Sequence, residues 1–316
     1  MKFFLKNKNN SELMAVRLAA DGLYAASLRQ EPTAKPVLEF LCFYPSDAVA
    51  PEILLERLAK ESPVKQKQCA VLLNQGEYQV LALDAMNVPD SELKNAVRWR
   101  IKEMVDYSVS EATVDVIRVP GDVNAGGRNQ SLIAIVAANK TIKLLQDRFL
   151  NLKLPLTTID IPEMAQRNIS SRLEVNGRGL AMLSFEQSGG LLTVTFGGEL
   201  YLSRRLDITI SQIRSADEET QRSVFERISL ELQRSLDHFD RQHNYITTAK
   251  LVLAPLGEIA ESLRDFLGTN MYMPVEILDL SSVVNLDKIP ELKSSEQQQR
   301  YFEIIGAALR GNGGQA

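Results

Sequence analysis

A three-strand pattern that occurs twice is the feature of this sequence that most constrains its fold. Residues 13–45 contain the apolar segments LMAVRLA, LYAASLRQ and PVLEFLCFYP, separated by an Asp-Gly turn and by proline-containing turns. Residues 179–208 repeat this arrangement with glycine turns, roughly 165 residues further along the chain. Such self-similarity is typical of an internal duplication. The sequence therefore predicts two lobes that each open with a three-stranded antiparallel meander.

The length and charge of the chain fit two lobes and argue against a dedicated nucleic-acid-binding protein. The 316 residues are 45% hydrophobic and 24% charged, and a chain of this length is large for a single core. The net charge of -4 is unlike that of nucleic-acid-binding domains, which are usually basic. No apolar run reaches the roughly 18 residues that a membrane-spanning helix needs, and no signal-peptide core is evident. We therefore expect a cytoplasmic protein.

The cysteines and histidines predict neither a disulfide nor a metal site. Cys42 and Cys69 lie in apolar runs outside any CxxC motif, so we expect two buried thiols. His238 and His243 are five residues apart, a spacing that does not place both side chains on one helix face.

Helices and strands alternate after each meander. The first part of the chain predicts a helix at 51–60, a hairpin at 69–84, an amphipathic helix at 91–107, strands at 112–120 and 131–139, a helix at 141–150 and a strand at 156–161. The buried face of the 91–107 helix is expected to carry Leu93, Val97, Ile101, Met104 and Val105. The second part predicts helices at 221–239, 256–267 and 298–310 and strands at 249–255 and 274–280.

This order of elements resembles one known α/β architecture. It is similar to the duplicated ribonuclease-H-like fold of the actin, sugar kinase and Hsp70 group (the ASKHA fold), with two lobes and an inserted strand-helix-strand-strand subdomain in the first lobe. The expected boundaries are 11–45 for the first part of the first lobe, 46–128 for the insertion, 129–165 for the rest of the first lobe, 166–290 for the second lobe, and 291–316 for a C-terminal helix that returns to the first lobe.

Four segments sharpen the resemblance. VPDSELKNAVRWRIKEMVDYSVSEATVDV (88–116) resembles the inserted subdomain of the PilM-like type IV pilus assembly family, and TTIDIPEMAQRN (157–168) resembles that family's crossing into the second lobe. ELQRSLDHFD (231–240) and YFEIIGAALRG (301–311) resemble its later helices. Each motif is moderately specific, and the likeness in this order covers nearly the whole chain. It implies a cytoplasmic protein, peripheral at the inner membrane, that binds the cytoplasmic tail of a PilN-like bitopic inner-membrane protein.

The same resemblance implies that the nucleotide site of the family is degenerate here. In the family pattern G-I-D-I-G-S-S-S, the glycines let backbone N–H groups approach phosphates and the aspartate serves the magnesium shell. In this chain the two glycine positions fall on Ala15 and Ala19, and the aspartate position falls on Arg17. A buried Arg17 needs a partner, and Glu186 on the second meander is the candidate. The alternative is that Arg17 reaches solvent from the end of its strand.

Two further elements of that site also depart from the family pattern. On the second meander, Ser184 replaces the family aspartate and Glu186 replaces a glycine. In the adenosine loop, Pro255 and Leu256 replace a glycine pair, which removes a backbone donor and adds bulk. We therefore expect no catalytic residues, no enzymatic activity and no ATP or magnesium cofactor.

The candidate residues for partner binding are Arg98, Trp99 and Arg100. Trp99 lies off the apolar stripe of the 91–107 helix, so it packs either against another subdomain or against a partner peptide. The two arginines either bind a partner or are solvated. Two other functions stay open at this point. One is an ATP-binding switch that regulates the same partner, and the other is a component of a type II secretion platform, whose usual form continues into a transmembrane helix.

Overall fold

The first lobe is built on a five-stranded mixed sheet. The computed structural model describes residues 13–61, 64, 67–122 and 130–310. Strand order in this sheet is β3-β2-β1-β4-β8, from β1 (Leu13–Ala19), β2 (Gly22–Arg29), β3 (Val37–Pro45), β4 (Gln68–Leu72) and β8 (Leu156–Asp160). The first three strands pair in antiparallel fashion, and β4 and β8 continue the sheet in parallel. The meander predicted at 13–45 is therefore present.

The second lobe repeats this sheet. Strand order is β11-β10-β9-β12-β13, from β9 (Gly179–Glu186), β10 (Gly189–Phe196), β11 (Glu199–Leu206), β12 (Thr248–Leu253) and β13 (Val275–Ile277). Again three antiparallel strands are followed by two parallel strands. The two sheets correspond strand for strand, which confirms the internal duplication.

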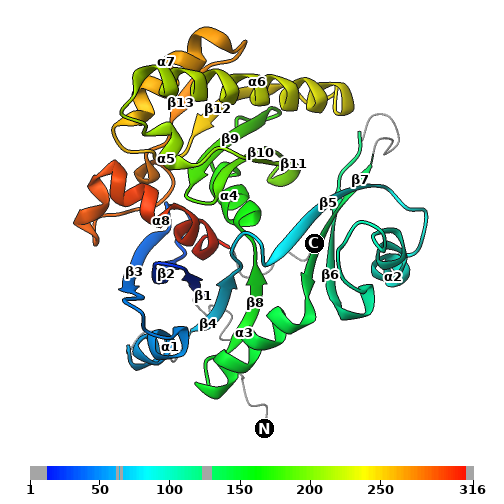
Figure 1. Ribbon diagram of the computed structural model, residues 1–316, viewed down its shortest axis with the longest axis vertical. Coiled ribbons are helices and arrows are strands. Elements are labelled where there is room, and N and C mark those ends of the chain that lie inside the picture. Colours follow the sequence, from blue (N-terminus) through cyan, green and yellow to red (C-terminus); the bar gives the residue numbers. More distant parts are fainter. Residues whose placement is uncertain (1–12, 62–63, 65–66, 123–129, 311–316) are drawn as a thin grey trace.

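Helices and sheets alternate in layers through the molecule (Figure 1). The outer face of the first sheet carries α1 (Pro51–Lys60) and α3 (Asn139–Asn151), and the outer face of the second carries α6 (Glu218–Gln242) and α7 (Ile259–Asn270). The short helix α5 (Ile210–Ile213) precedes α6. Local sequence sets several of these helix starts: proline occupies the first turn of α1, and the Asp217 side chain accepts a hydrogen bond from the Thr220 N–H at the start of α6.

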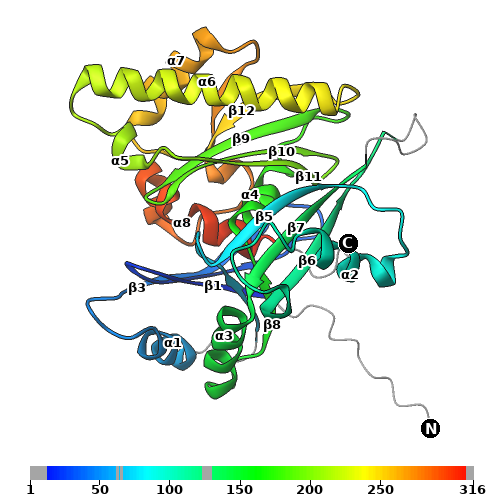
Figure 2. The same cartoon turned by 45° about the vertical axis from the view of Figure 1, so that its right-hand side comes forward.

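Two helices lie between the sheets, α4 (Pro162–Ser170) and α8 (Ser295–Ala308) (Figures 1 and 2). Small side chains allow this layer to be thin, because Ala15 on β1 and Ala26 on β2 are fully buried beneath α8. Gly306 brings α8 against α4 so closely that a Cβ there would lie 2.5 Å from the carbonyl oxygen of Ala165. The C-terminal helix thus contacts both lobes, and its position depends on small residues in three elements.

A third, three-stranded sheet stands beside the first lobe. It has the order β5-β7-β6, from β5 (Tyr78–Asp84), β7 (Ser131–Ala138) and β6 (Ala112–Val119), all antiparallel. Helix α2 (Asp90–Arg100) and the 3-10 turn η2 (Val109–Glu111) complete it, and Leu93, Val97 and Ile101 pack on the sheet. The insertion therefore has the strand-helix-strand-strand order that the sequence predicts.

The boundaries expected for this insertion do not coincide with the sheet. Helix α1 and strand β4 belong to the first lobe, whereas β7, assigned to the first lobe from the sequence, is the central strand of the small sheet. The expected boundary at 128 lies outside the described residues. The hairpin expected at 69–84 is also absent, because β4 pairs with β1 and β8 while β5 pairs with β7. Apolar alternation predicts a strand but does not say which sheet the strand joins.

Helix α2 is shorter than the sequence predicts. It ends at Arg100, and turns occupy the residues up to 107 before the chain enters β6. Ile101 and Val105 are buried as expected, but Met104 is half exposed, so its assignment to the buried face is wrong. The residues in this stretch favour a helix, but the chain has to reverse here to reach β6 alongside β7.

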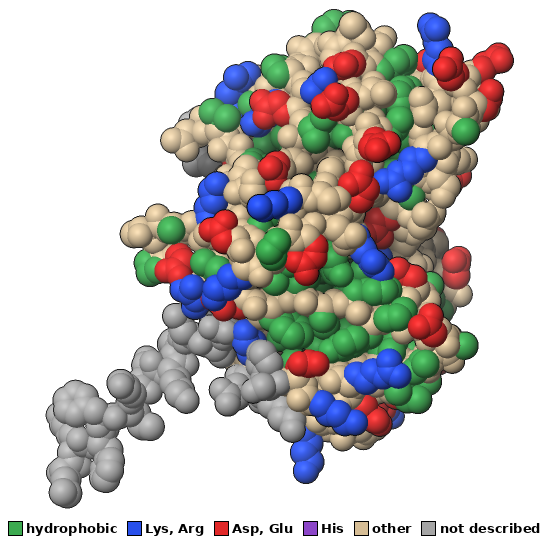
Figure 3. Space-filling model, turned by 90° about the vertical axis from the view of Figure 1, so that its left-hand side faces the viewer, with side chains coloured by type: hydrophobic (Ala, Val, Ile, Leu, Met, Phe, Trp, Pro, Cys, Tyr) green, Lys and Arg blue, Asp and Glu red, His purple; other side chains and the backbone are tan. Residues whose placement is uncertain are grey.

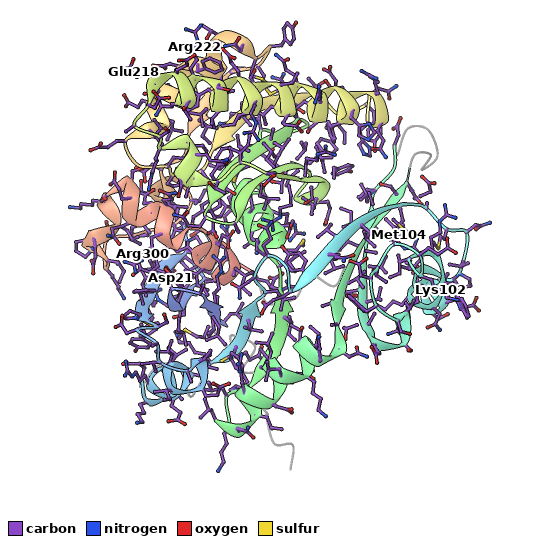
Figure 4. All side chains as sticks on the ribbon, viewed as in Figure 1. Asp21, Lys102, Met104, Glu218, Arg222 and Arg300 are labelled. Atoms are coloured by element: carbon purple, nitrogen blue, oxygen red, sulfur yellow. The ribbon has the colours of Figure 1, made fainter. Side chains whose placement is uncertain are left out.

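Two smaller features complete the fold. Strand β3 forms an edge of the first sheet, and hydrophobic side chains gather over this part of the lobe (Figure 3). There the Arg300 guanidinium of α8 lies 3.8 Å from the centroid of the Phe43 ring, near Asp21 at the tip of the first hairpin (Figure 4). Cys69 is buried, Cys42 is half buried and both are free thiols. None of the helices among the described residues combines the length and apolar character required to cross a membrane.

Candidate functional site

Arg17 lies between the two lobes at the centre of a charged cluster. Its side chain is only 13% exposed. Nη1 and Nη2 donate hydrogen bonds to Oε1 and Oε2 of Glu186 on β9, at 3.1 and 2.9 Å. Nε donates to Oδ1 of Asn74 at 3.1 Å. The ion pair predicted between Arg17 and Glu186 is therefore confirmed, and the alternative of a solvent-directed Arg17 is wrong.

A second carboxylate, Glu303 of α8, completes the cluster and was not anticipated from the sequence. Its Oε2 lies 2.6 Å from Nη1 of Arg17, and its side chain is 6% exposed. That oxygen receives no directed hydrogen bond from the described residues, so the contact is an ion pair only. Burial and the neighbouring Glu186 raise the pKa of Glu303 to about 8, although Arg17 opposes the shift. The one sign of this cluster in the sequence is that Glu303 is the single acidic residue in the apolar run YFEIIGAAL.

A related cluster joins the insertion to the second lobe. Arg205 on β11 donates from Nη2 to Oε1 of Glu163 on α4 at 2.8 Å, and to the hydroxyl of Tyr78 on β5 at 2.6 Å. The Tyr78 hydroxyl donates in turn to Oε2 of Glu163 at 2.5 Å. Burial and the charge of Glu163 raise the pKa of Tyr78, which keeps the phenol neutral. Each member of this triad comes from a different structural unit, so the three side chains fix how those units meet.

The other residues of the expected nucleotide cleft make ordinary packing contacts. Ala15 is fully buried and Ala19 is partly buried against the same core. Ser184 donates to Oε1 of Gln166 at 2.6 Å. Pro255 is buried after β12, and the buried side chain of Leu256 belongs to the core of the second lobe. Of the residues singled out from the sequence, the structure joins only Arg17 and Glu186 through a direct polar contact.

The chemistry of the Arg17 cluster is that of an ion-pair connection between lobes. Strand β1, strand β9 and helix α8 each supply one charged side chain, and both nitrogen termini of the guanidinium are already engaged by carboxylates. Carboxylates held in this way repel phosphate groups. They also occupy the Arg17 guanidinium, which could otherwise neutralise a phosphate.

A separate groove lies on the insertion, between α2 and the segment that follows it. Its volume is about 580 Å³, and Arg98, Trp99, Lys102, Tyr107 and Val109 are among the residues that line it. The Trp99 side chain is 77% exposed, which confirms that it lies off the apolar stripe and shows that it does not pack on another subdomain. Arg100 is also exposed but does not line this groove.

Comparisons with known proteins bear on the fold. No protein-family model matches the chain, and no curated protein does. A solved chain described as "PilM-PilN type IV pilus biogenesis complex" superposes with a TM-score of 0.71 over 96% of this chain and 99% of that chain, at 18% identity. A Bacteroides thetaiotaomicron protein with actin-like ATPase fold and unknown function superposes with a TM-score of 0.51 over 92% and 99% of the two chains, at 12% identity. The chain has the two-lobed actin-like fold, as its sequence predicts.

Proposed function

We propose that this chain is a non-catalytic, actin-like scaffold of a type IV pilus assembly machine, and that it binds the cytoplasmic tail of a PilN-like bitopic inner-membrane protein. The observation that carries the proposal is the fold shared, nearly end to end, with a chain of a PilM–PilN complex. The ordered motifs of the sequence support a finer assignment, to the mannose-sensitive haemagglutinin pilus and its biogenesis protein MshI. On this proposal the protein is cytoplasmic and is held at the inner membrane by its partner.

The charged cluster supports the non-catalytic part of the proposal. Where the family pattern has a carboxylate for magnesium, Arg17 forms a bidentate ion pair with Glu186 and contacts Glu303. A magnesium–phosphate group would have to displace both contacts and would meet two carboxylates in place of backbone N–H donors. We therefore assign the cleft the structural role of holding the lobes closed without nucleotide.

The insertion supports the binding part of the proposal. Trp99 offers a large exposed ring beside Arg98, and tryptophan with arginine is the composition that interface hot spots favour. A ring that is 77% exposed contributes little to the stability of the free chain. Its removal can therefore affect binding without affecting the fold.

The test is a binding titration between the purified chain and the cytoplasmic segment of the PilN-like protein, immobilised for interferometry, with and without MgATP. The expected result is saturable binding with the same affinity in both conditions. Trp99→Ala should weaken binding by about thirtyfold, corresponding to the ~2 kcal/mol typical of a hot spot, while circular dichroism stays unchanged. Tyr272→Ala is the matched control, because Tyr272 is a fully exposed aromatic side chain on the other lobe.

Three outcomes of this titration are decisive. A segment that fails to bind the intact chain removes the scaffold proposal. Binding that requires MgATP favours the ATP-dependent switch instead. Binding that Trp99→Ala leaves unchanged keeps the scaffold but moves its binding surface elsewhere.

A further inference from the structure

The charged side chains that line the groove on the insertion are all cationic. Two cationic side chains, Arg98 and Lys102, line it together with the aromatic rings of Trp99 and Tyr107. None of the residues that line it is a carboxylate, although the chain as a whole carries a net charge of -4. Glu103 and Asp106 lie on the same segment but do not line the groove. The groove is therefore a locally basic site on an acidic protein.

The cations of this groove lack the partners that their neighbours have. Nearer the start of α2, Lys94 pairs with Asp115 on β6 at 2.6 Å, and Asp90 pairs with Arg118. Among the described residues, neither Arg98 nor Lys102 forms an ion pair. The charged side chains at the start of α2 thus pair within the subdomain, whereas Arg98 and Lys102 line the groove without an ion-pair partner among the described residues. Figure 4 shows Lys102 beside α2, on the outer side of the insertion.

The apolar part of the groove has room for a side chain. Trp99 and Val109 border the same space of about 580 Å³, which is large enough to bury one or two bulky side chains of a partner. The site is concave, and this favours a peptide over a lipid surface, because contact with a bilayer requires apolar side chains on a protruding face.

We propose that this groove binds an acidic peptide segment that carries an apolar or aromatic anchor residue. The anchor packs on the Trp99 ring, and carboxylates on either side of it pair with Arg98 and Lys102. This inference rests on the proposed function, because it states the chemistry of the partner segment that the insertion takes. Screening reduces such exposed pairs at high salt, so binding should weaken as ionic strength rises.

Trp99 is the only tryptophan of the chain, so its fluorescence reports on the groove directly. The probes are three blocked synthetic peptides that differ only in charge: GEELFEEG, GQQLFQQG and GKKLFKKG. The expected result is a saturable shift of the Trp99 emission to shorter wavelength with the acidic peptide only. An equal response to the glutamine or lysine peptide overturns the inference. A larger response to phosphatidylglycerol vesicles than to the acidic peptide also overturns it and identifies a membrane-contact site.

Two double variants test whether Arg98 and Lys102 bind the acidic peptide. The double variant Arg98→Gln with Lys102→Gln should weaken binding of GEELFEEG by about tenfold, as expected for the loss of two partly exposed ion pairs. The control with the same change in net charge is Arg222→Gln with Arg234→Gln, two exposed arginines on α6 of the second lobe that do not line the groove, where the affinity should change by less than about twofold. Equal effects of the two double variants overturn the inference, because they would reflect net charge alone.

The same variants separate this inference from the proposed function. If the PilN-like segment binds the native chain and the groove double variant equally, the groove assignment is wrong and the scaffold function stands. If that segment does not bind the native chain but GEELFEEG binds in a manner that depends on Arg98 and Lys102, the scaffold function is wrong and the chemistry of the groove stands.

Discussion

Replacing Arg17 by methionine tests whether the interlobe cluster stabilises the fold. Methionine is uncharged and matches the aliphatic stem of arginine, so Arg17→Met keeps the packing of the stem. It removes the hydrogen bonds to Glu186 and Asn74 and the ion pair with Glu303. Glu186 is 29% exposed and can be rehydrated, but Glu303 is 6% exposed and cannot. The cost of the variant therefore depends mainly on whether Glu303 is ionised.

The structure indicates how large this cost should be at each pH. Removing one partner of a buried ion pair typically costs about 3–5 kcal/mol, because the other charge stays buried. Glu303 can avoid part of that cost by binding a proton, since burial already raises its pKa to about 8. Without Arg17 the pKa rises further. We expect a loss of about 2 kcal/mol in the free energy of unfolding at pH 7, chiefly from the Glu186 hydrogen bonds. At pH 9 we expect a loss of about 3.4 kcal/mol, because ionising Glu303 without Arg17 adds up to about 1.4 kcal/mol for the pH unit above its native pKa of about 8.

The assay is urea unfolding followed by circular dichroism at pH 7 and pH 9. Arg29→Met is the matched control: Arg29 makes ion pairs with Glu31 and Glu39, but its side chain is 44% exposed, so the same substitution should cost less than about 1 kcal/mol at both pH values. If Arg17→Met costs no more than Arg29→Met, or if its cost does not grow with pH, the assignment of a stabilising interlobe ion pair is refuted.

The remaining predictions concern the same layer of the molecule. Because the pKa of Glu303 is raised from 4.5 in the folded chain, its contribution to stability is fully present below pH 4.5 and is lost as pH rises through about 8. The free energy of unfolding of the native chain should therefore fall by up to about 1.4 kcal/mol per pH unit in that window, and that of Glu303→Gln should not. Parallel profiles of the free energy of unfolding for the two proteins between pH 5.5 and 8 would contradict this. Gly306→Ala should lower the free energy of unfolding in urea by about 1–3 kcal/mol, because the new Cβ would lie 2.5 Å from the Ala165 carbonyl oxygen. The control Gly268→Ala in α7, where a Cβ meets nothing within 4 Å, should instead stabilise the chain by up to about 1 kcal/mol. Equal effects of the two substitutions would exclude close helix packing as the cause. Calorimetry should detect no micromolar binding of MgATP to the native chain, and a stoichiometric binding isotherm would count against a structural role for the cleft.

Two features of the candidate sites were predictable from the sequence, one from local periodicity and one from the family resemblance. Arg17 and Glu186 occupy related strands of the two meanders, and the resemblance to a family in which both hairpins face one nucleotide indicated that they face one another. The exposure of Trp99 followed from its position off the apolar stripe of a helix.

The partners that the sequence did not reveal are contributed by elements far apart in the chain. Glu303 reaches Arg17 only because α8 returns between the lobes, and the triad of Tyr78, Glu163 and Arg205 depends on β5, α4 and β11 meeting at one point. A carboxylate in an apolar helix indicates that something compensates its charge, but it does not indicate which cation does so.

The apolar and glycine pattern by itself determined that this chain forms two equivalent three-stranded meanders with alternating helices and strands, because strand and turn preferences act over a few residues. Tertiary structure alone decided that β4 pairs with β1 rather than with β5, that α2 ends at Arg100, and that Glu303 of the last helix lies against Arg17 of the first strand. These outcomes depend on which surfaces become buried together. That choice is made by the packing of whole layers, and no short window of sequence contains it.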